Sequence, residues 1–229
     1  MRASFSGGPP LIILGGMTGS GKTEIYTHLI EEHLKKGRQV LYLLPEIALT
    51  TQIIERLKRN FGKIGVYHSR LNDSERVEIW KRVMDNDPAK GYRLIIGVRS
   101  SLFLPFSNLG LVIIDEEHDG SYKQHDPAPR YHARDSAIML AGFHRAKTIM
   151  GSASPSIESY YNALSGKYGL TELKERFGAV KLPVIILANT REAYRKKLMV
   201  SHFTPELLNA MDEALGKDRP AEVQGSERR

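Results

Sequence analysis

The chain has 229 residues, 41% of them hydrophobic, and a formal net charge of +7 at pH 7, which provides for one large α/β domain or one domain with part of a second and argues against global disorder. It has no cysteine, no apolar run near the roughly 20 residues of a membrane span and no signal-peptide core, so disulfides and thiolate zinc sites are excluded and we expect a cytoplasmic protein without a membrane partner. The positive charge suits a polyanionic partner, although charge alone does not distinguish DNA from RNA.

The first predicted element is a buried strand over residues 11–15, because this short run is continuously apolar and is ended by glycine. A helix is predicted from residue 22 to residue 36, just before Gly37. Between them lies the sequence Gly16-Met17-Thr18-Gly19-Ser20-Gly21-Lys22-Thr23, which fits the phosphate-loop pattern G-x-x-x-x-G-K-S/T at every fixed position.

The phosphate-loop pattern predicts a nucleotide site. Its glycines let successive backbone N–H groups point inward as an anion nest at the N-terminus of the following helix, where the helix dipole adds partial positive charge. Lys22 is expected to reach the β- and γ-phosphates, and the Thr23 hydroxyl to bind Mg²⁺. The alternative is a glycine-rich turn with an accidental lysine.

Alternating strands and helices continue along the chain. Apolar runs predict further strands at residues 40–44, 64–67, 94–98, 111–115 and 148–150. Helical spacing and caps predict helices at residues 47–61, 72–84, 133–143 and 155–164, with Val77, Trp80 and Met84 in the core. A short helix and turn are expected over residues 100–106, and an irregular polar and aromatic loop over residues 119–131. We therefore predict a doubly wound, mainly parallel α/β sheet with helices on both faces and with its ligands beyond the carboxyl ends of the strands.

The strand at residues 111–115 is followed by an acidic box, Asp115-Glu116-Glu117-His118. An acidic pair at a strand end suits a nucleotide hydrolase, in which Asp115 would hold Mg²⁺ together with Thr23 and Glu116 would polarise the attacking water. Repulsion within a buried carboxylate cluster favours a bound cation. The alternative is an acidic turn, and His118 is open to two interpretations, a link to a neighbouring polar loop or a solvated loop residue.

Several motifs resemble known helicases. The acidic box resembles the D-E-x-H box of superfamily 2 helicases, and Gly151-Ser152-Ala153-Ser154 resembles their Ser-Ala-Thr motif with serine in place of threonine. Longer stretches resemble one family, the PriA replication-restart helicases of bacteria, namely residues 17–26, 44–50, 68–69, 115–124 and 130–135. This resemblance extends over nearly all of residues 11–215 and implies a RecA-like P-loop NTPase domain.

The resemblance also implies an activity. The PriA family couples ATP hydrolysis with Mg²⁺ to 3′-to-5′ DNA unwinding at stalled forks, where it reloads the replicative helicase. Its implied partners are single-stranded and forked DNA, primosome proteins and single-strand-binding protein, and its zinc-binding cysteine cluster has no counterpart here. The residues implied to couple nucleotide to nucleic acid are Glu117, His118, Ser152, Ala153 and Ser154.

Two sets of DNA contacts are implied. Motifs of the family that line the single-strand path match Pro45, Glu46, Thr50, Arg99 and Ser100. The loop after the acidic box alternates rings with cations, which suits stacking of unpaired bases at about 1–3 kcal/mol each and contact with phosphates. The residues expected to sense DNA in this loop are Tyr122, Lys123, Arg130, Tyr131 and Arg134. The alternative is a surface loop whose tyrosines pack on the domain.

The expected domain organisation follows the resemblance. It comprises an N-terminal extension (1–10), an ATP-binding first helicase lobe (11–175), a linker with the start of a second lobe (176–215) and an unstructured tail (216–229). A strand at residues 184–187 and a helix at residues 201–215 are predicted in the third part. We expect a fragment that is weakly active or inactive by itself. Another superfamily 2 DNA translocase, and a truncated lobe that binds nucleic acid without turnover, are the alternatives.

Overall fold

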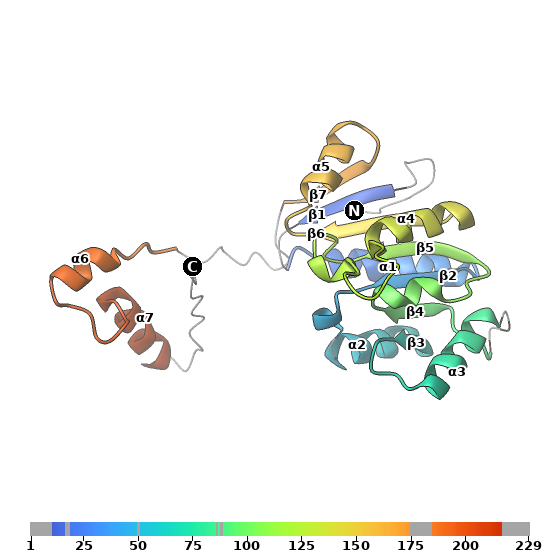
Figure 1. Cartoon of the computed structure of the whole chain (residues 1–229), viewed down its shortest axis with the longest axis horizontal. Helices are drawn as coiled ribbons and strands as arrows, with labels where there is room; N and C mark the ends of the chain where they lie inside the picture. The colour runs from blue at the N-terminus through green and yellow to red at the C-terminus, as the bar shows by residue number, and fades with distance from the viewer. Residues whose placement is uncertain are drawn as a thin grey trace. The chain divides into compact units, whose positions relative to one another are not determined.

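The computed structural model describes residues 11–16, 19–49, 51–85, 87, 89–174 and 185–216. The chain divides into two compact units between residues 180 and 181, so residues 11–174 and residues 185–216 are described separately (Figure 1). The predictions for Met17, Thr18 and Thr50, for residues 1–10 and for most of the linker and tail lie outside the described residues.

A seven-stranded sheet forms the centre of the first unit, and every strand pairs in parallel with its neighbours. In space the strands follow the order β3-β4-β2-β5-β6-β1-β7. Their bounds are Leu11–Gly16 (β1), Gln39–Leu43 (β2), Ile64–Tyr67 (β3), Leu94–Gly97 (β4), Leu109–Ile114 (β5), Lys147–Ser152 (β6) and Gly169–Leu173 (β7). The predicted parallel α/β architecture is therefore confirmed.

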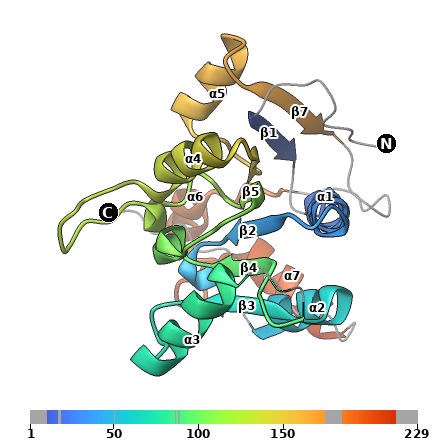
Figure 2. The same ribbon diagram turned by 90° about the vertical axis from the view of Figure 1, so that its right-hand side faces the viewer.

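Helices cover both faces of the sheet (Figure 2). One face carries α1 (Lys22–Lys35) and α2 (Thr51–Phe61), and the other carries α3 (Asp73–Met84), α4 (Ala133–His144) and α5 (Ile157–Leu164). Because successive side chains of a strand point to opposite faces, Leu41 and Leu43 of β2 enter the core under α3, α4 and α5, whereas Val40 and Tyr42 enter the core under α1 and α2. Strands buried on both faces explain the continuously apolar runs of the sequence.

Local sequence signals set several helix ends. Helix α1 ends next to Gly37, whose φ of +70° is the left-handed conformation that glycine adopts without strain. Helix α3 begins at a capping box, in which the Asn72 side chain and the Glu75 side chain each accept the other's backbone N–H at 2.9 Å. The helix predicted over residues 47–61 is split into a 3₁₀ helix, η1 (Glu46–Ala48), and α2.

Two predictions about strands are wrong. Strand β7 has no counterpart among the predicted elements, because it lies at the sheet edge and carries exposed polar residues such as Thr171 and Glu172 instead of an apolar run. The strand predicted at residues 184–187 is not formed by its described part, residues 185–187, which are irregular and largely exposed. In the described part of the second unit no strand is available to pair with them.

The predicted core stripe of α3 is also wrong. Trp80 is 43% exposed, and Val77 and Met84 on the same side of the helix are exposed as well. Helix α3 instead buries Ile79 and Val83, which are spaced four residues apart on the adjacent face. Both stripes are apolar with helical spacing, so periodicity alone did not distinguish them.

The second unit has two helices among its described residues, α6 (Thr190–Arg195) and α7 (Pro205–Gly216). Asn189 caps α6 by accepting the backbone N–H of Glu192 at 3.1 Å. Helix α7 corresponds to the helix predicted at residues 201–215 but begins four residues later. No helix in either described unit is long and apolar enough to cross a membrane.

Candidate functional site

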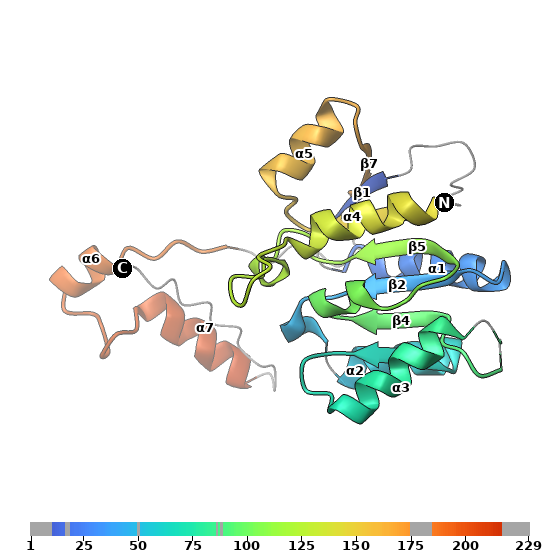
Figure 3. The ribbon, with the colours of Figure 1, turned by 45° about the vertical axis from the view of Figure 1, so that its right-hand side comes forward.

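The candidate site lies along the edge of the sheet where the strands end. Because the strands are parallel, the segments that follow β1, β2, β4, β5 and β6 all leave the sheet at this edge, and Figure 3 shows the arrowheads of β2, β4 and β5 pointing the same way. These segments contain the phosphate loop, the acidic box and most of the residues predicted to contact DNA. The topology therefore brings together motifs that are far apart in the sequence.

In the described part of the phosphate loop, the lysine reaches back to the first glycine. Gly19 and Gly21 have φ values of +80° and +91°, which favour glycine, and Gly21 is the N-cap of α1. The Lys22 ammonium is largely buried and donates a hydrogen bond of 2.5 Å to the Gly16 carbonyl. Among the described residues, the buried Ser20 Oγ has no hydrogen-bond partner. Thr23 lies half-buried in the first turn of α1.

The Asp115 carboxylate is buried among hydrogen-bond donors. Tyr26 Oη donates to Oδ1 at 3.1 Å, Tyr42 Oη donates to Oδ2 at 3.0 Å, and the Glu116 N–H donates to Oδ1 at 3.1 Å. Burial raises the pKa of Asp115, and the two tyrosine hydroxyls oppose that increase. The charge of Lys22 also opposes it, which places the phosphate-loop lysine within electrostatic range of the acidic box.

Glu116 occupies an unusual backbone conformation. Its φ is +46°, a left-handed value that non-glycine residues adopt at a cost of about 1–3 kcal/mol and that clusters at functional positions. Its side chain is 38% exposed, whereas the Asp115 carboxylate beside it is held by three hydrogen-bond donors. The two neighbouring carboxylates therefore differ in environment, as the two roles predicted for them require.

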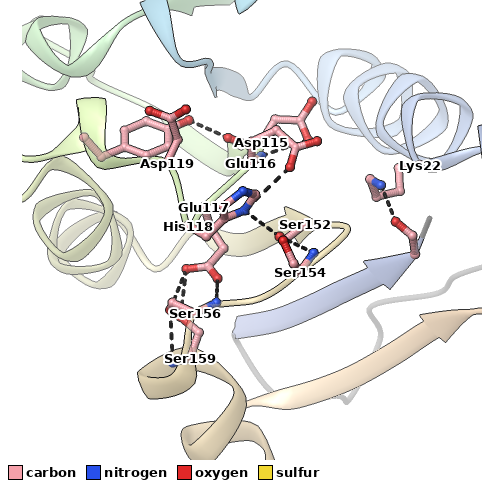
Figure 4. A network of polar contacts seen from close by, with 12 residues as sticks. Lys22, Asp115, Glu116, Glu117, His118, Asp119, Ser152, Ser154, Ser156 and Ser159 are labelled. Carbon is pink, nitrogen blue, oxygen red and sulfur yellow. Dashed lines mark hydrogen bonds and ion pairs between the residues drawn. The ribbon is translucent and has the colours of Figure 1, made fainter. Parts of the chain in front are cut away.

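The acidic box contacts the segment after β6 through His118. The Nδ1 of His118 hydrogen-bonds to Ser152 Oγ at 2.7 Å, and Ser152 Oγ accepts the backbone N–H of Ser154 at 3.0 Å (Figure 4). The neighbouring Ala153 is exposed. The structure therefore brings His118 and the serine motif together, as the first of the two interpretations of His118 predicts.

Glu117 points away from the other carboxylates and is fully buried (Figure 4). Its carboxylate accepts the backbone N–H of Ser156 at 2.6 Å, the Ser159 hydroxyl at 2.9 Å and Arg134 Nη1 at 3.0 Å. These contacts attach the acidic box to the N-termini of α4 and α5. Ser156 and Ser159 are not among the predicted site residues, although a serine just after Pro155 at a predicted helix start is a recognisable cap.

Tyr122 does not have the role predicted for it. Only 1% of its surface is exposed, and its hydroxyl donates to the backbone carbonyls of Asp115 at 2.6 Å and Leu43 at 3.2 Å. It lies at the end of a 3₁₀ helix, η3 (Gly120–Tyr122). A ring so placed has no free face for a base, so the prediction that Tyr122 stacks on DNA is wrong in this conformation. Tyr122 instead holds the backbone of the acidic box in place through its hydrogen bond to the Asp115 carbonyl.

Arg134 is likewise held within the protein. Its Nη1 lies 3.0 Å from the Glu117 carboxylate and its Nε 2.9 Å from the Asp135 carboxylate, and its side chain is only 13% exposed. The expected contact between Arg134 and a DNA phosphate is not available to a guanidinium in this arrangement. Its partner Glu117 was predicted as a coupling residue, but a pairing of the two was not foreseen.

A partly exposed aromatic pair lies beside the loop. Tyr131 is half-buried and meets the Phe103 ring edge-to-face, with centroids 5.2 Å apart and an angle of 81° between the planes. Phe103 ends the 3₁₀ helix η2 (Arg99–Phe103) and is 65% exposed. Phe103 is not among the residues predicted to contact DNA, because a single phenylalanine in an apolar stretch gives no sign of its exposure.

The cations near this pair are partly used by the loop. Arg99 Nη1 donates to the carbonyls of Ser121 and Lys123 at 3.1 and 3.3 Å, and the Lys123 ammonium donates to the Arg130 carbonyl at 2.6 Å. Arg130 itself is exposed. The bond between Lys123 and Arg130 holds the two ends of the loop together.

The remaining predicted DNA contacts lie at neighbouring strand ends. Pro45 is buried directly after β2, and the exposed Glu46 follows it in η1, where its carboxylate accepts a hydrogen bond from the Ser69 hydroxyl after β3. Ser100 is half-buried in η2 after β4. These residues share the edge of the sheet with the acidic box but do not contact its carboxylates through any hydrogen bond of the described residues.

The sequence of the chain is similar to those of known helicases. A family model described as DEAD/DEAH box helicase matches residues 8–163. The replication restart protein PriA of Chlamydia pneumoniae is 46% identical over 193 residues, which are 82% of this chain and 25% of that protein. The PriA of Bacillus subtilis (strain 168) is 42% identical over 212 residues, which are 92% of this chain and 26% of that protein.

The chain thus spans about a quarter of the length of these curated relatives. A solved structure of RecG bound to a three-way DNA junction has a TM-score of 0.52 and 24% identity, and the match covers 76% of this chain and 22% of that one. This likeness shows a shared fold, in agreement with the RecA-like architecture expected from the motifs.

Proposed function

Because this chain belongs to the DEAD/DEAH box helicase family, we propose that it is the ATP-binding lobe of a replication-restart DNA helicase resembling PriA. The observation that carries the proposal is the convergence of the phosphate loop, the acidic box and the Ser152 segment at one edge of the sheet. In a parallel α/β sheet that edge is where ligands bind.

The phosphate loop fits a nucleotide. Its glycines have the left-handed conformation that turns backbone N–H groups inward. Ser20 Oγ is a buried donor without an acceptor among the described residues, and a phosphate oxygen would supply one. Lys22 would exchange the Gly16 carbonyl for the β- and γ-phosphates.

Thr23 and Asp115 would hold Mg²⁺. Among the described residues, no group of three or more acidic or histidine side chains is arranged to hold a metal ion by itself. Mg²⁺ in nucleotide sites commonly takes only one or two protein ligands and completes its shell with water and phosphate oxygens, a pattern that one hydroxyl and one carboxylate suit. When bound, Mg²⁺ neutralises charge on the phosphates.

Glu116 would act on the attacking water. Its side chain is 38% exposed and stands on a strained backbone at the same strand end. It is therefore free to orient a water molecule and accept its proton. His118, through its bond to Ser152, would report the state of the nucleotide to the segment after β6.

The partners follow from the same proposal. We infer single-stranded and forked DNA as substrates, primosome proteins and single-strand-binding protein as partners, 3′-to-5′ unwinding and a cytoplasmic location, with residues 11–175 as the first lobe and 176–215 as the start of the second. The likeness of the chain to PriA proteins supports these inferences. Turnover by the isolated chain is expected to be weak, because helicases of this kind receive an arginine from a second lobe.

The test is the affinity of the 229-residue chain for a fluorescent ATP analogue, measured with Mg²⁺ and with or without single-stranded DNA. We expect saturable binding that Lys22→Ala weakens about tenfold or more, since the lysine makes charge-assisted hydrogen bonds to phosphate. Lys35→Ala, which changes an exposed lysine of the same helix, is the matched control.

The outcomes separate the alternatives. No nucleotide binding by the folded chain would refute the proposal, and DNA binding without nucleotide binding would identify a non-catalytic nucleic-acid-binding lobe. Equal affinity for forked and unforked DNA in a full-length relative carrying these residues would favour another superfamily 2 translocase.

A further inference from the structure

Two tyrosines that belong to neither the phosphate loop nor the acidic box hold the Asp115 carboxylate. The hydroxyl of Tyr26 donates to Oδ1 at 3.1 Å and the hydroxyl of Tyr42 donates to Oδ2 at 3.0 Å. Each carboxylate oxygen is therefore tied by its own donor. Rotation of the carboxylate about its terminal bond would therefore break the hydrogen bonds of both oxygens at once.

The two tyrosines are themselves fixed. Both rings are fully buried, and they meet edge-to-face with centroids 5.7 Å apart. Tyr26 lies one turn after Lys22 on α1, and Tyr42 lies in the middle of β2. Their hydroxyls are therefore donors placed by the helix of the phosphate loop and by the centre of the sheet, and neither depends on a mobile side chain.

Gly151 makes room for one of them. A Cβ atom added to Gly151 would lie 1.6 Å from Tyr26 Oη and 3.1 Å from Asp115 Oδ1. Any side chain at this position of β6 would therefore displace the Tyr26 hydroxyl from the carboxylate. Glycine is therefore required at the first position of the serine motif, because only the absence of a side chain lets Tyr26 of α1 reach the acidic box.

The donors are not equally distributed over the two oxygens. Oδ1 accepts from Tyr26 and from the Glu116 N–H, whereas Oδ2 accepts from Tyr42 alone among the described residues. A carboxylate oxygen has about two lone-pair positions. Oδ2 is therefore the oxygen with an acceptor position left for a further ligand.

We propose that Tyr26 and Tyr42 are positioning residues, which orient the Asp115 carboxylate so that its Oδ2 faces the Mg²⁺ of a bound Mg–nucleotide complex. This inference rests on the proposed function and assigns it two residues of this chain.

The test measures how Mg²⁺ strengthens nucleotide binding. Affinity for a fluorescent ATP analogue is determined over a series of Mg²⁺ concentrations and in EDTA, for the 229-residue chain and for Tyr26→Phe, Tyr42→Phe and the double variant. We expect the double variant to reduce the Mg²⁺-dependent gain in affinity about tenfold, because hydrogen bonds to a charged group are lost. Affinity in EDTA should stay unchanged.

Two further variants sharpen the result. Gly151→Ala should reproduce the effect of Tyr26→Phe while leaving both hydroxyls in the chain. Tyr92→Phe is the matched control, since the Tyr92 ring packs under Lys63 and Arg82 and takes no part in the cluster around Asp115. Thermal unfolding of each variant reports the folded fraction, so that a loss of stability is not counted as a loss of affinity.

The possible outcomes separate the role of the two tyrosines from the proposed function. Wild-type binding that requires Mg²⁺, together with an unchanged Mg²⁺ dependence in the folded double variant, would overturn the role of the tyrosines alone. A folded wild-type chain that binds no Mg–nucleotide would overturn the proposed function, and with it the positioning role.

Discussion

The guanidinium of Arg134 lies 3.0 Å from the carboxylate of Glu117, and their side chains are only 13% and 0% exposed. The same carboxylate accepts the backbone N–H of Ser156 at the start of α5. One buried acid thus connects the end of β5 with the first turns of two helices. Such an ion pair is retained only if its remaining lone pairs are satisfied, and here hydroxyl and backbone donors complete the set.

Replacement of Glu117 by alanine should destabilise the first unit strongly. The change leaves Arg134 buried with one partner fewer and removes the acceptor at the N-terminus of α5, so we expect a loss of about 3–5 kcal/mol in the free energy of unfolding. Urea denaturation followed by circular dichroism measures it. Asp135→Ala is the matched control, because this exposed carboxylate binds the same guanidinium and should cost at most about 1 kcal/mol. Equal losses in the two variants would contradict the prediction.

The partly exposed pair of Phe103 and Tyr131 should bind unpaired bases. Since stacking of one base on an aromatic ring contributes about 1–3 kcal/mol, Phe103→Ala and Tyr131→Ala should each weaken binding of a thymidine oligonucleotide about 5- to 150-fold. Fluorescence anisotropy at fixed salt measures the affinity. Phe143→Ala removes an 80% exposed phenylalanine from the far end of α4 and should change nothing.

Tyr122 provides the contrast for that experiment. Its ring is buried and its hydroxyl is used by two carbonyls, so Tyr122→Phe should lower stability and leave the affinity for the oligonucleotide unchanged. If Tyr122→Phe weakened DNA binding as much as Tyr131→Ala, the loop would have to open when it meets DNA.

Stability should fall on mild acidification. Burial lowers the pKa of His33 below its ordinary value of 6.5, and the ring donates a hydrogen bond from Nδ1 to the Leu29 carbonyl at 2.8 Å. The unfolded chain then binds the proton at a higher pH than the folded chain, so the stability present above pH 6.5 is lost as the pH falls through the folded-state pKa. Urea midpoints at pH 7.5 and 5.5 measure the loss. His33→Gln should flatten this dependence, and the exposed His28→Gln should not.

The parts of the site that sequence predicted are those with local signatures. The phosphate loop combines two left-handed glycines with a helix start, and Asp115 follows a run of apolar residues, so both could be located from neighbouring residues alone. The burial of Tyr122 depends on a carbonyl 79 positions earlier, at Leu43. Its sequence resembles that of an exposed aromatic loop, and only the tertiary fold removes its ring from solvent.

Long-range contacts also explain why two predictions about the fold are wrong. Trp80 shares its helix with a second apolar stripe, and the choice between the stripes is made by the sheet on which the helix packs. Strand β7 is stabilised by its pairing with β1 and not by its own composition. Contacts with residues far away in the sequence therefore determine which stripe of a helix is buried and whether a polar segment forms a strand, where the local pattern allows either.

The position of β1 has a consequence for biosynthesis. Ile13 pairs with Met150 of β6 on one side and with Leu170 of β7 on the other, so the strand that carries the phosphate loop has no neighbour in the sheet until those late segments have left the ribosome. Contacts of such long sequence separation form slowly. The nucleotide pocket is thus among the first parts of the lobe to be translated and among the last to be assembled, and a nascent chain released before residue 147 would carry the complete loop sequence without the strands that hold it in place.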